Sequence, residues 1–437
     1  VGSEMCIRDS RNPVASGFVN AMLREFIRND KKLPKGRNAT EELSIEYSAP
    51  VWLTEKWTRE YGKDICLEML KTSVGQAPVT ARVNTVFHSL ESTLDMLAEE
   101  GITFERLSVL PDCIRICGAG AVEHTKAYKE GRIHVQDLSS QLCCAALDPK
   151  ESDTVLDLCA APGGKTFTIA ERMNNKGRVL AFDLHKNRAG LIESGAKRLG
   201  LDCISAGVNN AKVYDEKMPK ADKVLCDAPC SGLGVIRRKP EIKYKEPSDF
   251  DRLPEIQYDI LKTSAEYVKV GGTLVYSTCT LSRAENDEVA DRFLAEQLTG
   301  RNIRVITNSL AVFNILVNHA PTEVILTGGD YRDNTNTFVG PITNLVLGKL
   351  KYNKAFISCN GIYNSSITTY SLEEGESQQI ALDNSKNKYL LADNKKFNRA
   401  DFYIYYDLFN FDTLITDNTI DDEVLSHYKQ YVQIMTV

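Results

Sequence analysis

No stretch of this 437-residue sequence is apolar over a length that could span a bilayer, so we expect no transmembrane helix and no membrane partner. No secretory leader is recognisable, which favours a cytoplasmic protein. None of the 12 cysteines falls in a CxxC pair, so the sequence predicts neither a zinc or other metal site nor a disulfide framework. Thiols without such pairing suit a reducing compartment.

A strong excess of basic charge is also missing. The chain has 53 lysines and arginines against 59 aspartates and glutamates, and its net charge is −6. This balance excludes a basic coat over the whole surface, although local basic patches remain compatible with it. Apolar residues make up 43% and charged residues 26% of the chain, as in ordinary globular proteins. The length is sufficient for two or three domains.

Two common nucleotide-binding patterns do not fit the Gly-rich segment VLDLCAAPGGKT (residues 155–166). It contains neither GxGxxG nor GxxxxGK[ST], so an ATP site is disfavoured. Its first half suits a buried parallel strand, and PGGKT predicts a tight turn into a helix, with close backbone approach to a ligand. A second apolar run, RVLAFD, ends in Asp183, about 20 residues after the glycines, where dinucleotide-binding folds place the acid that holds ribose hydroxyls. This spacing favours a nucleoside-containing cofactor.

Two cysteines stand just past the ends of apolar, strand-like runs. Cys230 is the last residue of KVLCDAPC, which also contains Asp227, and Cys279 is the last residue of GGTLVYSTC. A single cysteine at a strand end is most often a small buried hydrophobe. Two of them, each in a polar loop downstream of the Gly-rich turn, indicate a site where a thiolate and an acid meet a nucleoside beside a bound cofactor.

The three segments resemble those of the RNA cytosine-5 methyltransferases, specifically the Sun/RsmB ribosomal-RNA family, over about residues 11–298. The resemblance implies methylation of carbon 5 of a cytosine in small-subunit (16S) ribosomal RNA, with S-adenosyl-L-methionine as cofactor. It also implies an α/β fold, the class I (Rossmann-like) doubly wound sheet. Alternating strands and helices through Thr280 independently predict a doubly wound parallel sheet.

The chemistry of such a reaction explains the residue types. Carbon 5 of cytosine becomes nucleophilic when a thiolate adds at carbon 6, and protonation at ring nitrogen 3 assists this addition. Asp227 is the candidate acid, and Lys165 is expected to orient Asp227 or the target base. From the residues alone either thiol could be the nucleophile. The resemblance assigns that role to Cys279 and assigns release of the product to Cys230.

The resemblance also implies the cofactor-binding residues. These are Cys159, Ala160, Ala161, Pro162, Gly163, Gly164, Lys165, Asp183, Arg188, Asn210 and Asp227. One position departs from the family pattern, because Asn210 stands where an Asp-Ala pair usually places an acid against the adenine amino group. An amide oxygen still accepts that hydrogen bond, so we expect weaker binding rather than none.

A basic run directly after the second motif is a candidate RNA-binding segment. GVIRRKPEIKYK (residues 234–245) carries five basic residues against one acid. Its position favours contact with the phosphate backbone through Arg237, Arg238, Lys239 and Lys243.

The family pattern predicts the following division of the chain. Residues 1–10 match nothing in the family, 11–37 resemble the end of a NusB-like helical domain, 38–130 a helical plus small α+β RNA-binding module, and 131–298 the methyltransferase domain without its last two strands. We therefore expect the sheet to end, with an open edge, at the strand preceding Cys279.

Residues 299–437 resemble part of a different family, the sugar-phosphate sensor of DeoR-type repressors of lactose phosphotransferase operons. Gly328, Gly329, Asn360, Glu374 and Lys396 are expected to line an effector cleft. No winged helix accompanies this segment, so DNA is not an expected partner. Incomplete domains on both sides favour a chimeric gene model. Two alternative functions follow: a fragment of a sugar-phosphate-responsive regulator, or a non-catalytic RNA-binding remnant.

Overall fold

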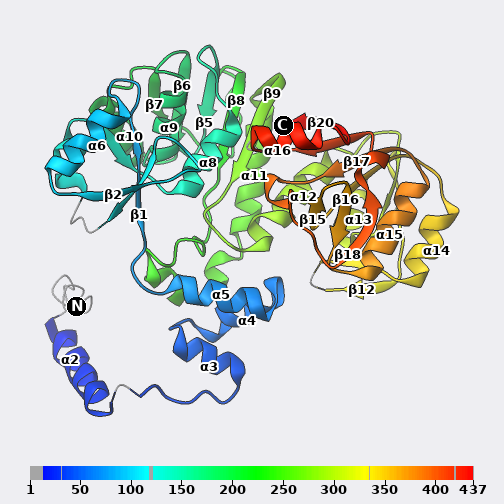
Figure 1. Cartoon of the computed structure of the whole chain (residues 1–437), viewed down its shortest axis with the longest axis horizontal. Coiled ribbons are helices and arrows are strands. Elements are labelled where there is room, and N and C mark those ends of the chain that lie inside the picture. The colour runs from blue at the N-terminus through cyan, green and yellow to red at the C-terminus, as the bar shows by residue number, and fades with distance from the viewer. Residues whose placement is uncertain (1–12, 31, 118–121, 334, 418–419, 437) are drawn as a thin grey trace. The chain divides into compact units, whose positions relative to one another are not determined.

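The computed structural model describes residues 13–436 apart from 31, 118–121, 334 and 418–419 (Figure 1). The expected leader at residues 1–10 lies outside the described residues. The chain divides into two compact units, the first formed by Val1–Gln76 with Ile236–Pro247 and the second by Ala77–Val235 with Ser248–Val437. In the described part of the chain, none of the helices combines the length and apolarity that crossing a bilayer takes.

The first unit is helical. Its helices α4 and α5 pack against each other through Leu53, Trp57, Cys66 and Leu70, which are almost fully buried. The apolar residues recur three to four positions apart along each helix, so that one face of each is buried. Its elements are α2 (Pro13–Arg28), α3 (Ala39–Glu46), α4 (Val51–Tyr61), α5 (Lys63–Ser73) and the 3-10 helix η2 (Pro240–Tyr244).

The second unit begins with a small antiparallel sheet ordered β2-β3-β1-β4, which packs against helix α6. Ala81 and Ile114 of the sheet are buried with Leu94 and Leu97 of α6. Its elements are β1 (Val79–Val83), α6 (Leu90–Glu99), β2 (Thr103–Arg106), β3 (Cys113–Cys117), η1 (Val122–His124), α7 (Lys126–Lys129) and β4 (Ile133–Val135).

A five-stranded parallel sheet ordered β7-β6-β5-β8-β9 follows in the same unit, which confirms the predicted doubly wound α/β fold. Strand order reverses between β5 and β8, the place where such folds bind ligands. The elements are α8 (Leu138–Leu147), β5 (Thr154–Asp157), α9 (Gly164–Arg172), β6 (Arg178–Asp183), α10 (Lys186–Leu199), β7 (Ile204–Val208), β8 (Ala221–Asp227), η3 (Pro247–Phe250), α11 (Leu253–Glu266), β9 (Val268–Ser277), η4 (Arg283–Glu285) and α12 (Asp287–Glu296).

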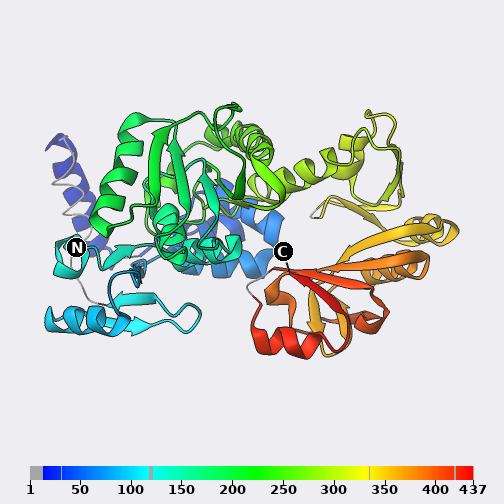
Figure 2. The ribbon, with the colours of Figure 1, turned by 90° about the horizontal axis from the view of Figure 1, so that it is seen from above.

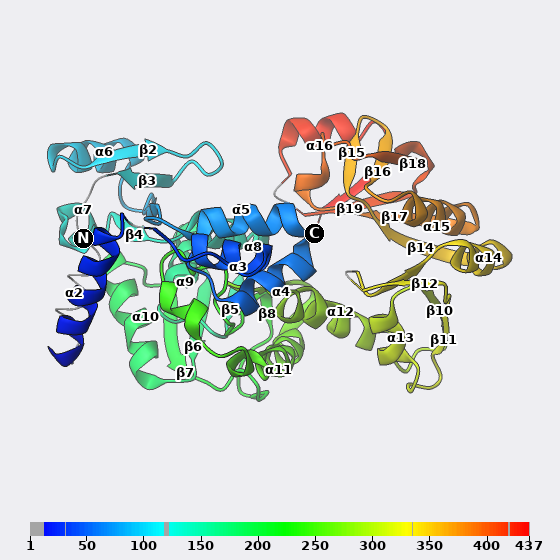
Figure 3. The ribbon, with the colours of Figure 1, turned by 90° about the horizontal axis from the view of Figure 1, so that it is seen from below.

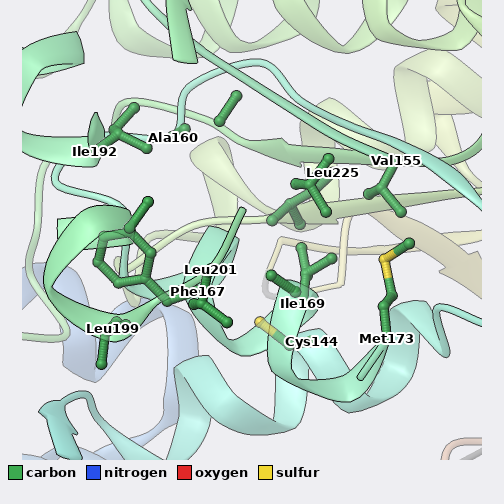
Figure 4. Close-up of a cluster of buried hydrophobic side chains, with 14 of the residues drawn as sticks. Cys144, Val155, Ala160, Phe167, Ile169, Met173, Ile192, Leu199, Leu201 and Leu225 are labelled. Atoms are coloured by element: carbon green, nitrogen blue, oxygen red, sulfur yellow. The ribbon is translucent and has the colours of Figure 1, made fainter. Parts of the chain in front are cut away.

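Alternation along the strands builds one hydrophobic core on each face of this sheet. In β5, Val155 faces the core formed with α8, α9 and α10, and Leu156 faces the core formed with α11 and α12. In β8, Leu225 belongs to the first core, and its neighbours Val224 and Cys226 belong to the second. Figure 4 shows part of the first core. Two buried faces require nearly continuous apolar strands, the pattern found in the sequence.

The sheet ends at β9, as expected, since β9 pairs with β8 and the next described strand pairs elsewhere. Strand β10 (Arg304–Thr307) forms a separate parallel pair with β11 (Glu323–Leu326). Helix α13 (Leu310–Leu316), between them, packs against α12. The Thr322 hydroxyl also lies 2.9 Å from the carbonyl oxygens of Leu298 and Arg301.

The rest of the chain forms a further α/β arrangement, coloured yellow to red in Figures 2 and 3. A parallel sheet ordered β14-β17-β19-β20 and an antiparallel sheet ordered β15-β16-β18 contribute to one core. The elements are β12 (Asp330–Arg332), β13 (Thr337–Val339), α14 (Pro341–Lys349), β14 (Tyr352–Ser358), β15 (Gly361–Tyr363), β16 (Ser366–Thr369), α15 (Leu372–Asp383), β17 (Ser385–Leu391), η5 (Asn394–Lys396), β18 (Tyr403–Asp407), η6 (Leu408–Asn410), β19 (Thr413–Thr416), α16 (Asp422–Tyr428) and β20 (Gln433–Thr436).

Candidate active site

The two predicted cysteines meet at the carboxyl edge of the parallel sheet. Strands β8 and β9 run side by side, so the loops that leave them lie together. The Sγ atoms of Cys230 and Cys279 are 2.9 Å apart, and the backbone N–H of Cys279 donates to Sγ of Cys230 at 3.2 Å. The Gly234 N–H donates to the Cys279 carbonyl at 3.0 Å. The pairing of neighbouring strands therefore brings together two thiols that are distant in sequence.

The surroundings of the two thiols make them unequal. A hydrogen bond from the Cys230 thiol lowers the pKa of Cys279 to about 7, against the opposing effects of partial burial and of Asp227. The Lys165 ammonium lowers the pKa of Cys279 further. Donating that hydrogen bond, together with burial, raises the pKa of Cys230 well above its ordinary value. Cys279 is exposed and Cys230 is half-buried, so the accessible sulfur is the one that ionises first.

Lys165 and Asp227 form an ion pair beside the thiols. Nζ of Lys165 lies 2.7 Å from Oδ2 of Asp227, and the Ser277 hydroxyl donates to Oδ1 at 2.6 Å. Burial opposes the charge on Lys165, but the attraction of Asp227 outweighs it and raises the pKa of Lys165. Lys165 comes from the first turn of α9, whereas Asp227 and Ser277 end β8 and β9. The pair thus joins the Gly-rich turn to the cysteine loops.

A cavity of about 530 Å³ opens next to Cys279 and Lys165. Its volume lies within the range of small-molecule sites. The lining residues are Asp137, Ser139, Ser140, Cys143, Lys165, Gly234, Val235, Tyr276, Ser277, Thr278, Cys279, Thr280, Leu281, Asn286, Asp287 and Ala290. This lining is mixed polar and apolar, and it presents one exposed thiol and one ammonium to the same space.

The Gly-rich turn has the tight geometry predicted from PGGKT. Gly163 has φ +112°, and a Cβ at this position would lie 2.4 Å from the Phe167 ring, so a residue with a side chain does not fit. The Gly163 N–H donates to the Ala160 carbonyl at 2.8 Å, and the Ala160 N–H donates to the Phe182 carbonyl at 2.8 Å. These bonds tie the turn after β5 to the end of β6, where Asp183 lies.

Asp183 and Arg188 lie together beside this turn. The Asp183 side chain is almost fully buried, and its Oδ1 accepts from the His185 N–H at 3.2 Å. Nη1 of Arg188 lies 3.5 Å from Oδ2 of Asp183, and Nη2 donates to the Ala161 carbonyl at 2.8 Å. The predicted ribose-binding acid is therefore joined through Arg188 to the Gly-rich turn.

Neighbouring asparagines after β7 differ in their surroundings. Asn210 is exposed, and its Oδ1 accepts from the Lys212 N–H at 3.2 Å. The Asn209 N–H donates to the Asp183 carbonyl at 3.1 Å, and Nδ2 of Asn209 is buried without a hydrogen-bond partner among the described residues. Both asparagines thus lie on the loop that follows the strand next to β6.

Sequence reasoning did not single out Asp157, which ends β5 at the same edge of the sheet. It is fully buried, and burial raises its pKa to about 7 although the Thr166 hydroxyl donates to Oδ2 at 2.6 Å. Its Oδ1 has no partner among the described residues. In the sequence, the feature that could have identified this residue is an acid inside the apolar run TVLDL. With Nδ2 of Asn209, this oxygen leaves one unsatisfied polar atom, within the described part of the chain, at each of the two strand ends that flank Asp183.

The basic side chains of residues 234–245 differ in their exposure to solvent. Arg237, Arg238 and Lys239 are exposed, whereas Lys243 is only 4% exposed and its Nζ donates to the Ser48 carbonyl at 2.5 Å. Lys243 is therefore not part of an exposed RNA-binding patch, because its ammonium is buried and donates a hydrogen bond to a backbone carbonyl of the helical unit. The spacing of charges along the sequence could not show that this residue faces inward.

The predicted effector residues lie in several elements of the C-terminal part. Gly328 and Gly329 both have positive φ, and the Thr343 hydroxyl donates to the Gly328 carbonyl at 2.5 Å. The Thr369 hydroxyl donates to Oδ1 of Asn360 at 3.0 Å. Glu374 lies in the first turn of α15, and Lys396 ends η5. These contacts account for the glycines and Asn360 as structural residues, and an effector role stays a prediction.

The sheet order, the two-sided helical cover and the turn after β5 define a class I methyltransferase fold. A family model described as 16S rRNA methyltransferase RsmB/F matches residues 144–322, and an RsmF/B-like ferredoxin-like domain matches 49–123. A DeoR C terminal sensor domain matches 290–418, so the first and last matches overlap over residues 290–322.

Curated relatives support the match to the RsmB/F methyltransferase family. The chain is 43% identical over 285 residues to the probable ribosomal RNA small subunit methyltransferase B of Bacillus subtilis, covering 64% of each chain. It is 32% identical over 314 residues to the ribosomal RNA small subunit methyltransferase B of Pectobacterium carotovorum, covering 70% of this chain and 71% of the relative. The chain belongs to this RsmB/F family, and it spans about 64% of the length of the Bacillus relative.

A solved structure also matches. A methyltransferase homolog protein from Pyrococcus horikoshii is 25% identical, with a TM-score of 0.53. The match covers 64% of this chain and 93% of that chain.

Proposed function

We propose that the chain methylates carbon 5 of a cytosine in 16S ribosomal RNA through a covalent bond between Cys279 and carbon 6 of the base. The observation that supports this most directly is the exposed Cys279 sulfur, with its lowered pKa, beside a second thiol and a Lys165–Asp227 pair. Family membership supports ribosomal RNA as the substrate class.

S-adenosylmethionine supplies an electrophilic methyl group when it is bound at the carboxyl edge of the sheet. Asp183 and Arg188 would hold its ribose end, the turn from Cys159 to Gly164 would approach it closely, and Asn210 would accept a hydrogen bond from its adenine amino group. The unsatisfied oxygen of buried Asp157 offers a further acceptor.

The reaction begins with addition of the Cys279 thiolate to carbon 6. The Lys165–Asp227 pair delivers the proton needed at ring nitrogen 3, and Ser277 holds the carboxylate in place from its other oxygen. Carbon 5 becomes an enamine carbon and takes the methyl group. Because the Asp227 carboxylate is paired with Lys165, the Lys165 ammonium that lines the cavity carries the proton in this scheme, and Asp227, the acid expected from the sequence, holds that ammonium in place.

Release requires loss of the carbon 5 proton and breakage of the carbon–sulfur bond. Once Cys279 is bonded to carbon, its sulfur is no longer an anion that holds the Cys230 proton. Cys230 then passes its own proton to solvent and accepts the carbon 5 proton, the Cys279 thiolate departs, and the proton on ring nitrogen 3 returns to the Lys165–Asp227 pair. Because both thiols must stay reduced between turnovers, we place the activity in the cytoplasm.

The domain boundaries given by the sequence are part of this proposal. Residues 11–37 and 38–130 serve RNA binding, together with exposed Arg237, Arg238 and Lys239, and residues 131–298 carry out the chemistry. Residues 299–437 form a partial sensor-like domain without a part in catalysis.

The test is incubation of the purified chain with radiolabelled S-adenosylmethionine and 16S ribosomal RNA that lacks the modification. After nuclease digestion, label in 5-methylcytidine supports the proposal, and Cys279→Ala should give none. Label on another nucleoside would contradict the cytosine assignment. Absence of cofactor binding in calorimetry would instead favour an RNA-binding remnant, and stabilisation by a sugar phosphate alone would favour the regulator.

A further inference from the structure

Glu285, which ends η4, is a buried acid attached to the loop of Cys230. Its side chain is 2% exposed. Oε2 accepts from the Ser231 N–H at 2.8 Å, and Oε1 accepts from the Ser231 hydroxyl at 2.5 Å. Both donors belong to the residue directly after Cys230, so the carboxylate fixes the backbone and the side chain of that loop at one point.

Asn286, the next residue, attaches to the loop of Cys279 in the same way. Its Oδ1 accepts from the Thr278 hydroxyl, and its Nδ2 donates to the Thr280 carbonyl at 3.1 Å. Thr278 and Thr280 flank Cys279 on both sides. Two consecutive residues after β9 therefore each hold one of the two cysteine loops.

Further bonds join the two attachments into one network. The Ser231 and Thr280 hydroxyls lie 2.7 Å apart. Nε2 of Gln257, from α11, donates to the Pro229 carbonyl at 2.9 Å and to Oε2 of Glu285 at 3.0 Å. The residues on both sides of Cys230 are thus held by the network that also holds Cys279.

The network favours a carboxylate at position 285. The Glu285 carboxylate accepts hydrogen bonds from the Ser231 N–H and hydroxyl, from Nε2 of Gln257 and, at 3.5 Å, from the Thr280 hydroxyl. An amide in its place would lose the negative charge, and its NH₂ group would face either the N–H donors of Ser231 and Gln257 or the hydroxyls of Ser231 and Thr280, which would then have to turn to accept and give up their present bonds. A merely space-filling role would not discriminate between Glu and Gln, which have almost the same shape.

We propose that Glu285 and Asn286 are positioning residues that hold Cys230 and Cys279 at the separation needed for attack and release. This inference rests on the proposed function of the two thiols. Neither residue touches the reacting atoms in this scheme, so they act through Ser231, Thr278 and Thr280. A displacement of a reacting group by about 1 Å lowers rates by about 10²-fold, and this is the effect expected on the rate of methyl transfer.

The experiment compares Glu285→Gln and Asn286→Ala with the matched control Glu288→Gln, an exposed glutamate of α12. Three quantities are measured: kcat and KM for methyl transfer, thermal unfolding, and the rate of Cys230–Cys279 disulfide formation with diamide, followed by mass spectrometry of the linked peptides. Diamide takes up the two electrons and two protons released by the thiols. The third readout reports the relative placement of the sulfurs without any methyl transfer.

The proposal expects both variants to lower kcat about 10²-fold with little change in KM for S-adenosylmethionine, and to slow disulfide formation several-fold, while Glu288→Gln changes neither. Unchanged kcat, or lower kcat with unchanged disulfide formation, would overturn it. If the Glu285→Gln variant does not fold, the proposal is judged on Asn286→Ala alone, from its kcat and its rate of disulfide formation. If even the unmodified chain transfers no methyl group, the proposed function fails, and normal disulfide rates in the variants would then refute the positioning role separately.

Discussion

Lys165 and Asp227, 62 residues apart in sequence, form an ion pair in which Nζ and Oδ2 are 2.7 Å apart. The lysine lies in the first turn of α9, directly after the Gly-rich turn, and the aspartate ends the strand that leads to Cys230. The pair therefore couples the two halves of the proposed site, since a change in one loop moves the charge that serves the other.

Replacing Lys165 by Met should lower the rate of methyl transfer by about 10²- to 10⁴-fold, the range of a general acid or base contribution. The reason is loss of the proton source that faces the cavity. Single-turnover transfer to 16S ribosomal RNA measures it. The matched control is Lys176→Met, whose exposed ammonium pairs with Glu151 at 2.8 Å and should leave the rate unchanged. Equal rates in both variants would exclude Lys165 from the chemistry.

The two cysteines should fail in different ways. Cys279→Ala should abolish the covalent RNA adduct, because the nucleophile is gone, whereas Cys230→Ala should accumulate it, because release is blocked. Denaturing gels show the adduct as a shifted band. Cys117→Ala, an exposed thiol in β3, serves as control and should behave as the unmodified chain. Reversed outcomes would exchange the two roles.

The pH dependence of adduct formation follows from the pKa of Cys279. Since only the thiolate adds to carbon 6, the rate should rise with pH through about 7 and level off above it. In Cys230→Ala the hydrogen bond that lowers this pKa is lost, so the inflection should move upward, towards an ordinary thiol. Single-turnover rates across the neutral range measure both curves. Identical curves would show that the two sulfurs are not coupled.

Asn210→Asp should tighten binding of S-adenosylmethionine by about 1 kcal/mol, since a carboxylate accepts a stronger hydrogen bond from an amino group. The neighbouring Asn209→Asp is the comparison, because its buried Nδ2 would be replaced by an oxygen. Isothermal calorimetry gives both affinities. Unchanged or weaker binding in Asn210→Asp would mean that this side chain does not face the adenine.

Deleting residues 328–437 should leave kcat for methyl transfer unchanged. Both cores of the parallel sheet consist of residues between Cys143 and Phe293, and the sheet ends at β9. The cut keeps Thr322, whose hydroxyl lies against the carbonyls of Leu298 and Arg301. Methyl transfer and thermal unfolding of the shortened chain are the measurements. A large loss of activity would show that the C-terminal part supports the site.

The apolar runs and polar strand ends predicted the parallel sheet, the Gly-rich turn and the two cysteine loops, because these features depend on residues that are close together in the sequence. Local patterns did not reveal Glu285 and Asn286, whose importance depends on bonds to loops that precede them by about 54 and 8 residues. They also did not separate Lys243 from the exposed basic residues near it.

The sequence by itself determined which reactive groups are present: two thiols, an acid and a lysine after buried strands, with a glycine turn whose backbone a ligand can approach. The tertiary structure decided how these groups act on one another. Only the adjacency of β8 and β9 places the sulfurs of Cys230 and Cys279 2.9 Å apart, and that contact is the largest cause of the difference between their pKa values. Hydrogen bonds and charges act over a few ångströms, and those distances are set by how distant segments pack, not by their spacing along the chain.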